Sequence, residues 1–326
     1  MSEKFYKNPV AIFILATLAC ILWGSAFPSL KVSYAALGIG QSGYAVKLQF
    51  AGYRFFLAAV YLLVFMIVTK RSLKISKDLI VPLVALGIVQ TTLQYLFFYN
   101  GLANITGVKG AIMTSLGTFF SIVLPHFYYA NDKMNLQKWL GLSLGFAGVV
   151  YVNMAKGPIT GGFSWSGEGL MIMAALTGAV ASIMAKELSG RMDTVTMTCY
   201  QMFSGATIMI LFSWINLGGN VITISTDILP VFLHLALISS AGFGIWFSLL
   251  RNNPISRVSI YKFQIPIWGS ILSALFIPGE SLNIEIIASL LLVSSGIFLV
   301  NMPQRKKIAS SDLTSSEDTS SKVTSS

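Results

Sequence analysis

Long apolar segments recur along the whole chain and constrain its fold more than any other feature. An α-helix needs about 20 apolar residues to cross the hydrocarbon core of a bilayer. The alternating pattern of a β-barrel is absent, and lipid cannot satisfy an open backbone. We therefore predict an all-α integral membrane protein with ten transmembrane helices, at residues 10–30, 46–68, 79–102, 108–129, 136–154, 167–185, 195–217, 228–250, 255–278 and 284–302.

Composition supports a membrane location. Charged residues make up 10% of the chain and hydrophobic residues 55%, with a mean hydropathy of +0.73, whereas soluble domains carry about 25% charged residues. A net charge of +10 could suggest a nucleic-acid partner, but the basic residues lie in breaks between apolar segments and not along one face. We expect the lipid bilayer, and no nucleic acid, as the partner.

The distribution of Lys and Arg predicts the orientation. With the N-terminus in the cytoplasm, the breaks assigned to the outside hold only Lys31, Lys47, Lys109 and Lys156, and the other breaks hold most of the basic residues. This bias predicts a multi-pass protein of the cell (plasma) membrane with both termini cytoplasmic. Residues 1–9 form the cytoplasmic N-terminus, and the Ser- and Thr-rich residues 303–326 are predicted to be a disordered cytoplasmic tail.

An internal repeat appears when the sequence is shifted by 148 positions. Pro82 then meets Pro230, Asn104 meets Asn252, and residues 152–154 meet residues 300–302 with identical letters. The repeats are predicted at 10–154 and 167–302, joined by an outside linker at 155–166. Because each repeat has five helices, the second must be inverted, which is typical of alternating-access transporters.

Short motifs in several predicted helices resemble one known family. They are Trp23 to Pro28, Arg54 to Leu57, Ile265-Pro266, Gly279-Glu280 and Gly296. In order and spacing the chain resembles the EamA-type ten-helix members of the drug/metabolite transporter superfamily. The resemblance implies five-plus-five helices around a central cavity, with the fifth and tenth at the periphery. The first repeat departs from the pattern, with Asn131-Asp132 where the second has Gly279-Glu280.

Four ionisable residues lie well within predicted helices, and such groups are costly in a membrane. Lys262 is a candidate for substrate contact, since Pro266 four residues later frees a backbone carbonyl; alternatively, Lys262 snorkels to the interface. Arg54 binds substrate or pins its helix through backbone carbonyls. His126 and His234, with Lys262, are the proton-coupling candidates, although a lone histidine is often a neutral packing residue.

The third predicted helix is unusually polar. Gln90 and Gln94 are one turn apart and share a face, and Tyr95 follows. These side chains form a cavity wall or hold helices together. With Trp23, which either lines the cavity or anchors at the lipid interface, they complete the predicted substrate-binding set: Lys262, Gln90, Gln94, Tyr95, Trp23, Pro266 and Arg54.

The chain carries no P-loop, zinc signature or nucleophile motif. We therefore expect no enzyme activity, no cofactor and no metal. The predicted function is secondary-active export or exchange of a small organic metabolite, anionic or zwitterionic, by alternating access. The alternative is a non-transporting membrane receptor or scaffold on the same fold. Gly141, Gly145 and Gly148 allow close helix contact and suggest the face of a homodimer.

Overall fold

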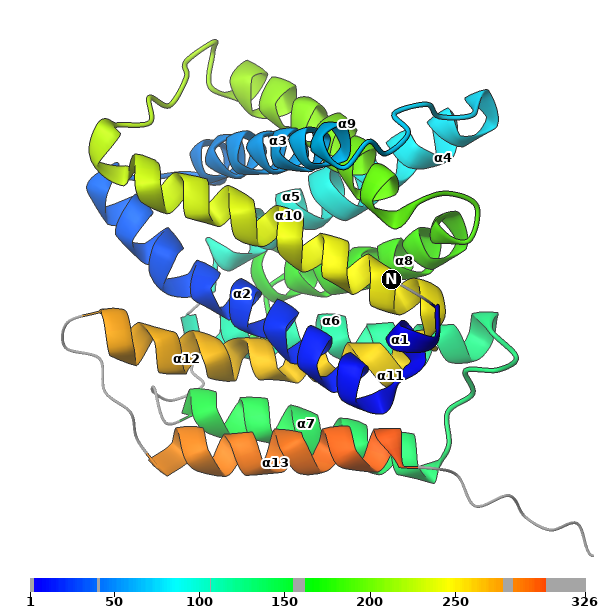
Figure 1. Ribbon diagram of the computed structural model, residues 1–326. Helices are drawn as coiled ribbons and strands as arrows, with labels where there is room; N and C mark the ends of the chain where they lie inside the picture. The colour runs from blue at the N-terminus through cyan, green and yellow to red at the C-terminus, as the bar shows by residue number, and fades with distance from the viewer. Residues whose placement is uncertain (1–2, 40–41, 106, 155–161, 278–283, 303–326) are drawn as a thin grey trace, which may run out of the picture.

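The computed structural model describes residues 3–39, 42–105, 107–154, 162–277 and 284–302, and every regular element in these ranges is a helix (Figure 1). Along the chain they are α1 (Glu3–Lys7), α2 (Pro9–Ala36), α3 (Tyr44–Val68), α4 (Lys77–Gly87), η1 (Ile88–Leu93), α5 (Gln94–Leu102), α6 (Gly107–Tyr128), α7 (Leu136–Met154), η2 (Trp165–Gly169), α8 (Leu170–Ser189), α9 (Thr194–Asn216), η3 (Thr226–Ile228), α10 (Leu229–Asn252), α11 (Ile255–Ser259), η4 (Ile260–Phe263), α12 (Gln264–Phe276) and α13 (Ile284–Asn301).

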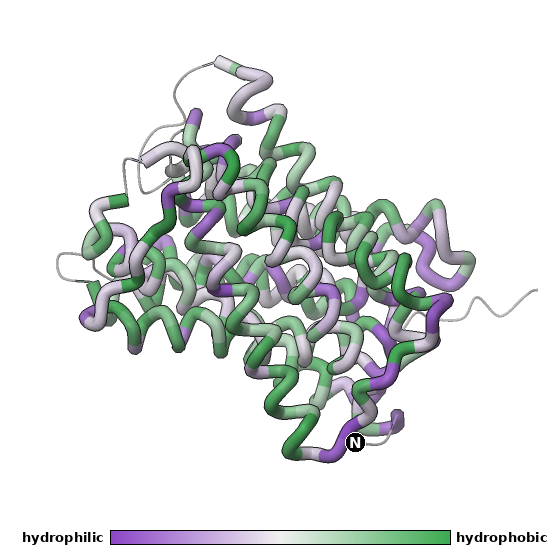
Figure 2. Tube along the Cα trace, turned by 90° about the horizontal axis from the view of Figure 1, so that it is seen from above, coloured by the Kyte–Doolittle hydropathy of each residue, from purple (hydrophilic) through white to green (hydrophobic). Residues whose placement is uncertain are grey.

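Helix occupies each of the ten predicted segments. Within the described ranges, seven helices are long and apolar enough to cross a membrane: 9–36, 44–68, 77–102, 165–189, 194–216, 226–252 and 284–301. Figure 2 shows apolar residues along the helices and hydrophilic residues gathered mainly at their ends and connections. These findings confirm an all-α membrane protein, and the number of ten crossings stays a prediction. Of the predicted linker at 155–166, residues 155–161 lie outside the described residues, and so does the predicted tail at 303–326.

Local signals explain where several helices begin and end. The Asn8 side chain accepts from the amide of Val10 at 2.9 Å, and Pro9 starts α2 with a residue that has no amide to satisfy. Asp193 caps α9 in the same way, accepting from Val195 and Thr196 at 3.1 Å. These caps satisfy amides that the helices leave without an internal partner.

The helices pack in corresponding pairs. The second helix of the first predicted repeat, α3, packs on the second of the other, α9, and the fifth helices, α7 and α13, also pack together. The contact of α2 with α12 has its counterpart in α8 with α6, and that of α2 with α10 in α8 with α5. Two repeats related by a two-fold axis would produce this pairing. The repeat boundaries stay a prediction.

Helices α7 and α13 lie side by side at one edge of the bundle (Figure 1), as the family resemblance implies. A Cβ atom on Gly141 would lie 2.6 Å from the carbonyl oxygen of Gly296, and one on Gly148 would lie 2.9 Å from Val293. Gly145 faces the ring of Phe263. These glycines therefore allow packing within the chain and do not form an outer face for a second copy. The homodimer itself stays a prediction.

Two helical segments change helical type along their length. The segment 77–102 passes from α4 through the π-helix η1 into α5, and the segment 255–276 passes from α11 through the 3-10 helix η4 into α12. A change of helical type redirects the side chains that follow it. Most of the predicted site residues lie in or next to these two changes, namely Gln90, Gln94, Tyr95, Lys262 and Pro266.

Candidate functional site

Five aromatic side chains form a continuous row between the two repeats. The ring centroids are 5.2 Å apart for Trp246 and Trp23, 5.2 Å for Trp23 and Phe243, 6.3 Å for Phe243 and Phe55, and 4.7 Å for Phe55 and Tyr95. The row joins helices α10, α2, α3 and α5. Trp246 and Phe55 are buried, and the other three are half-buried. We call these five residues the aromatic row.

A cation lies against each end of the aromatic row. Lys262 Nζ is 5.0 Å from the ring centroid of Trp246. Arg54 Cζ is 4.4 Å from the ring of Phe55 and 5.8 Å from that of Tyr95. The faces of aromatic rings attract cations at these distances. Lys262 and Arg54, two predicted site residues that are far apart in sequence, are thus brought to the same aromatic row.

Both cations retain capacity for a further partner. For Lys262 the described residues provide the contact with Trp246 but no hydrogen bond or ion pair. The guanidinium Nε of Arg54 is buried without a hydrogen-bond partner among the described residues, and so is the indole nitrogen of Trp246. Buried polar groups are normally hydrogen-bonded, and these N–H groups are therefore able to donate to a further polar partner.

The 3-10 helix η4 sets the direction of Lys262. Pro266, the third residue of α12, has no N–H group to donate to the carbonyl of Lys262, which an uninterrupted α-helix would require, and η4 ends three residues earlier, at Phe263. The thiol of Cys20 donates to the carbonyl oxygen of Tyr261 at 3.2 Å and ties this turn to α2. Lys262 consequently lies over an indole that is only 1% exposed, which favours substrate contact over snorkelling.

Trp23 reaches the row because small residues let α2 approach its neighbours. A Cβ atom on Gly242 of α10 would lie 2.7 Å from the Trp23 indole nitrogen. A Cβ atom on Gly24 would lie 2.8 Å from Cβ of Trp268 on α12, and Gly269 faces Phe27. The glycines therefore allow the close helix packing that membrane helices use in place of a hydrophobic driving force, and Trp23 lies within the protein, not at a lipid interface.

The polar residues of the third membrane segment lie mainly between helices. Gln90 donates to Gln94 at 2.6 Å, which confirms that the two share a face. A Cβ atom on Gly178 of α8 would lie 2.9 Å from the Gln94 amide. Thr91 donates to Gln201 at 3.1 Å. The bond from Thr91 holds η1 to α9, Gln94 packs on α8, and no hydrogen bond joins Gln90 or Gln94 to the aromatic row in the described part of the chain.

The two histidines lie away from the aromatic row. His126 Nδ1 accepts from the amide of Met134 at 3.0 Å, and Lys133 donates to the His126 carbonyl oxygen at 2.8 Å. His126 thus organises the connection after α6. His234 is exposed on α10, with Nε2 3.2 Å from the Ser25 hydroxyl. Of the three proton-coupling candidates, Lys262 is the one that the structure brings to the row.

The predicted substrate-binding set did not include Phe55, Phe243 or Gln201, although Phe55 lies within one of the family motifs. The two phenylalanines look like ordinary apolar residues, and only their contacts reveal the row. Gln201 carried a signal, because it occupies the position in the second repeat that Arg54 occupies in the first. Its amide nitrogen is buried without a hydrogen-bond partner among the described residues, so the corresponding position in the second repeat also presents a buried polar group.

Comparisons with known proteins find relatives that are named as transporters. The chain is 25% identical over 301 residues to the uncharacterized transporter YvbV of Bacillus subtilis, covering 91% of this chain and 93% of that protein. It is 22% identical over 292 residues to the S-adenosylmethionine/S-adenosylhomocysteine transporter of Chlamydia muridarum, covering 85% and 87%. A solved crystal structure shares the fold, with a TM-score of 0.73 and 14% identity over 90% of this chain and 97% of that chain.

The decisive match is to a family and not to a single relative. The EamA-like transporter family matches residues 10–154 and again residues 165–302, which is nearly the whole membrane-embedded part of the chain. The two matches coincide with the two halves whose helices pack in corresponding pairs and share the aromatic row. This multi-pass membrane protein therefore belongs to the EamA-like transporter family.

Proposed function

We propose that this protein moves a small organic metabolite, anionic or zwitterionic, across the plasma membrane by secondary-active export or exchange, with both termini in the cytoplasm. The observation that carries the proposal is the aromatic row with Lys262 and Arg54 at its ends. Substrate would bind between the repeats, as in other inverted-repeat transporters. Alternating access would expose the aromatic row to each side of the membrane in turn.

The charges at the row decide the substrate class. Both cations lack an ion pair among the described residues, and an uncompensated pair of positive charges in a membrane is costly. A carboxylate or phosphate on the substrate would supply the missing negative charge. Flat rings such as Trp23 and Tyr95 would stack on an apolar or aromatic part of the same molecule.

One relative is consistent with this substrate class. The Chlamydia muridarum protein is named for S-adenosylmethionine and S-adenosylhomocysteine, and each of these compounds carries an amino-acid carboxylate and a purine ring. Such a molecule would place its carboxylate at a cation and its purine among the aromatic residues. S-Adenosylhomocysteine, which is zwitterionic, is accordingly a suitable first probe for this chain, and S-adenosylmethionine, whose sulfonium gives it a net positive charge, is its matched cationic control.

The competing function is a receptor or scaffold that does not transport. A structural core does not require Lys262 beside a buried indole, or an arginine whose Nε lacks a partner, because each raises the cost of burial. These features favour a ligand, and flux then separates a transporter from a receptor.

The test is counterflow in proteoliposomes. Purified protein is first screened by thermal shift against matched anionic, zwitterionic and cationic metabolites, since a bound ligand raises apparent stability. Vesicles that contain the wild-type protein and are loaded with a ligand from this screen should accumulate the labelled form of that ligand. Vesicles that contain the Lys262→Met protein should not. Ligand binding without counterflow would support a receptor, and a preference for cations would contradict the proposed substrate class.

A further inference from the structure

Two grooves on the outside of the helix bundle correspond to each other. One, of about 710 Å³, lies between α4, α6 and α8, and the other, of about 300 Å³, lies between α2, α10 and α12. Leu124 and Tyr128 line the first, and Leu272 and Phe276, each 148 positions later, line the second. The grooves therefore occupy equivalent places in the two repeats, but the first is more than twice as large.

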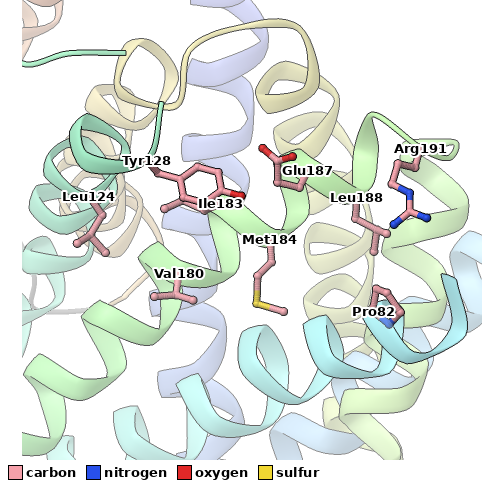
Figure 3. Close-up of a pocket in the computed structure, with 9 residues that line it drawn as sticks. All are labelled: Pro82, Leu124, Tyr128, Val180, Ile183, Met184, Glu187, Leu188 and Arg191. Carbon is pink, nitrogen blue, oxygen red and sulfur yellow. The ribbon is translucent and has the colours of Figure 1, made fainter. Parts of the chain in front are cut away.

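The larger groove has an apolar wall that faces lipid. Figure 3 shows Met184 and Leu188 reaching from α8 towards Pro82 on α4, with Tyr128 on the opposite side. Tyr128 is 61% exposed and Val180 is 43% exposed. Exposed apolar side chains on membrane helices contact lipid chains and not water. The volume of about 710 Å³ is within the range of pockets that hold an organic ligand.

A carboxylate and a guanidinium line the same end of the larger groove. Glu187 and Arg191 are four residues apart at the end of α8. The Tyr129 hydroxyl donates to Glu187 at 2.6 Å, and Arg191 donates to Asp78 at 2.6 Å. The bond to Asp78 uses one of the five N–H groups of the guanidinium. By contrast, no acidic side chain, lysine or arginine lines the smaller groove among the described residues.

The length of the larger groove matches one leaflet of a bilayer. Its lining residues run along α8 from Val180 and past the end of the helix to Arg191, a separation of eleven positions. At about 1.5 Å per residue this distance is about 16 Å, and half of the hydrocarbon core is about 15 Å. The charged end, with Glu187 in the last turn of α8 and Arg191 just beyond it, is at the level expected for headgroups, and the apolar end reaches towards the middle of the membrane.

We propose that the larger groove binds a phospholipid with a primary ammonium in its headgroup, namely phosphatidylethanolamine. One acyl chain lies along Val180, Ile183 and Met184. The phosphate accepts hydrogen bonds from Arg191, whose planar donors suit phosphate oxygens. The ammonium donates to the carboxylate of Glu187. A quaternary ammonium has no N–H to donate, phosphatidylglycerol brings no cation to Glu187, and the serine headgroup brings its own carboxylate beside that of Glu187, so the two charges together select the ethanolamine headgroup.

This proposal does not rest on transport, and its test measures binding alone. The full chain, purified in detergent, is titrated in native mass spectrometry with dioleoyl phosphatidylethanolamine, phosphatidylcholine and phosphatidylglycerol. The ethanolamine lipid should bind about tenfold more tightly than the other two, since one hydrogen bond between charged groups is involved. Equal binding of all three lipids, or tightest binding of phosphatidylglycerol, would overturn the proposal.

Variants separate the contribution of the two charged residues to lipid binding from that of the apolar wall. Glu187→Gln keeps an acceptor for Tyr129 but removes the charge, so the preference for ethanolamine over choline should disappear. Arg191→Gln should weaken the binding of all three lipids about tenfold, because all three carry the phosphate that Arg191 contacts. These two residues lie at the exposed end of the groove, so their variants remain informative if a change in the wall prevents folding.

The equivalent position in the smaller groove provides a matched control. Ile183→Trp would fill the larger groove and should weaken the binding of all three lipids about tenfold or more. Ser29 lines the smaller groove at the position of Ile183 when the first helices of the two repeats are aligned. Ser29→Trp should therefore leave phosphatidylethanolamine binding unchanged, and an equal loss in both variants would show that the lipid binds elsewhere.

Discussion

Replacing Lys262 by methionine tests the proposed role of the aromatic row. Methionine keeps the length and apolar stem of the side chain but removes the charge that lies 5.0 Å from the ring centroid of Trp246. If Lys262 contacts an anionic group of the substrate, the loss should be about 1.5–3 kcal/mol, as for other hydrogen bonds to charged groups. This corresponds to an increase in Kd of about 10- to 150-fold.

The same substitution should have little effect on folding. It removes a cation–π contact of about 0.5–2 kcal/mol, but it also removes the desolvation cost of a half-buried charge. The two effects oppose each other, so we expect the free energy of unfolding to change by less than about 1 kcal/mol. A selective loss of affinity without a loss of stability would separate substrate contact from a structural role.

Lys186 provides the matched control for this experiment. It is a partly buried lysine on α8 whose ammonium donates to the carbonyl oxygens of Leu250 at 2.7 Å and Asn253 at 2.5 Å. Lys186→Met should therefore reduce stability by about 1.5–3 kcal/mol and leave substrate affinity unchanged. Lys262→Arg should keep part of the affinity, because the charge remains while its geometry changes.

The assay is ligand affinity of the purified protein in nanodiscs, by calorimetry, with thermal unfolding recorded for each variant. The ligand is the best anionic or zwitterionic compound from the thermal-shift screen. Equal affinity in wild type, Lys262→Met and Lys262→Arg would refute the role of Lys262 in substrate contact. A cationic substrate would refute it as well.

Three further predictions concern topology, coupling and packing. A reporter fused at Lys74 should read cytoplasmic and one within residues 216–227 should read outside, because basic residues gather on the cytoplasmic side; an outside signal at Lys74 would contradict the inverted repeat. Any proton-driven flux should disappear when His126, His234 and Lys262 are all made neutral, with Lys262→Met alone accounting for most of the loss; flux that survives the triple change would exclude all three candidates. Gly205→Ala should lower stability by about 1–3 kcal/mol, because the new Cβ atom would lie 2.6 Å from Cβ of Thr91. Gly244→Ala, which meets nothing within 4 Å, should instead raise stability by about 0.5–1 kcal/mol in thermal unfolding.

The sequence by itself determined the class of protein, because that property is a sum over many residues. Apolar segments long enough to span a bilayer need no tertiary contact to be recognised. The shift of 148 positions that aligns Pro82 with Pro230 likewise needs only the order of the letters. That alignment gives α7 and α13, and likewise α3 and α9, equivalent positions in the two repeats, and the structure packs the members of each pair together.

Only the tertiary structure decided which of the candidate residues meet. In a membrane helix the side facing lipid and the side facing other helices are both apolar, so the periodicity that reveals the inner face of a soluble helix is weak. The sequence could not tell that Lys262 lies over Trp246 while His126 binds the connection after its own helix. Those contacts depend on the rotation of each helix about its axis, which close packing at residues such as Gly242 and the 3-10 turn before Pro266 sets.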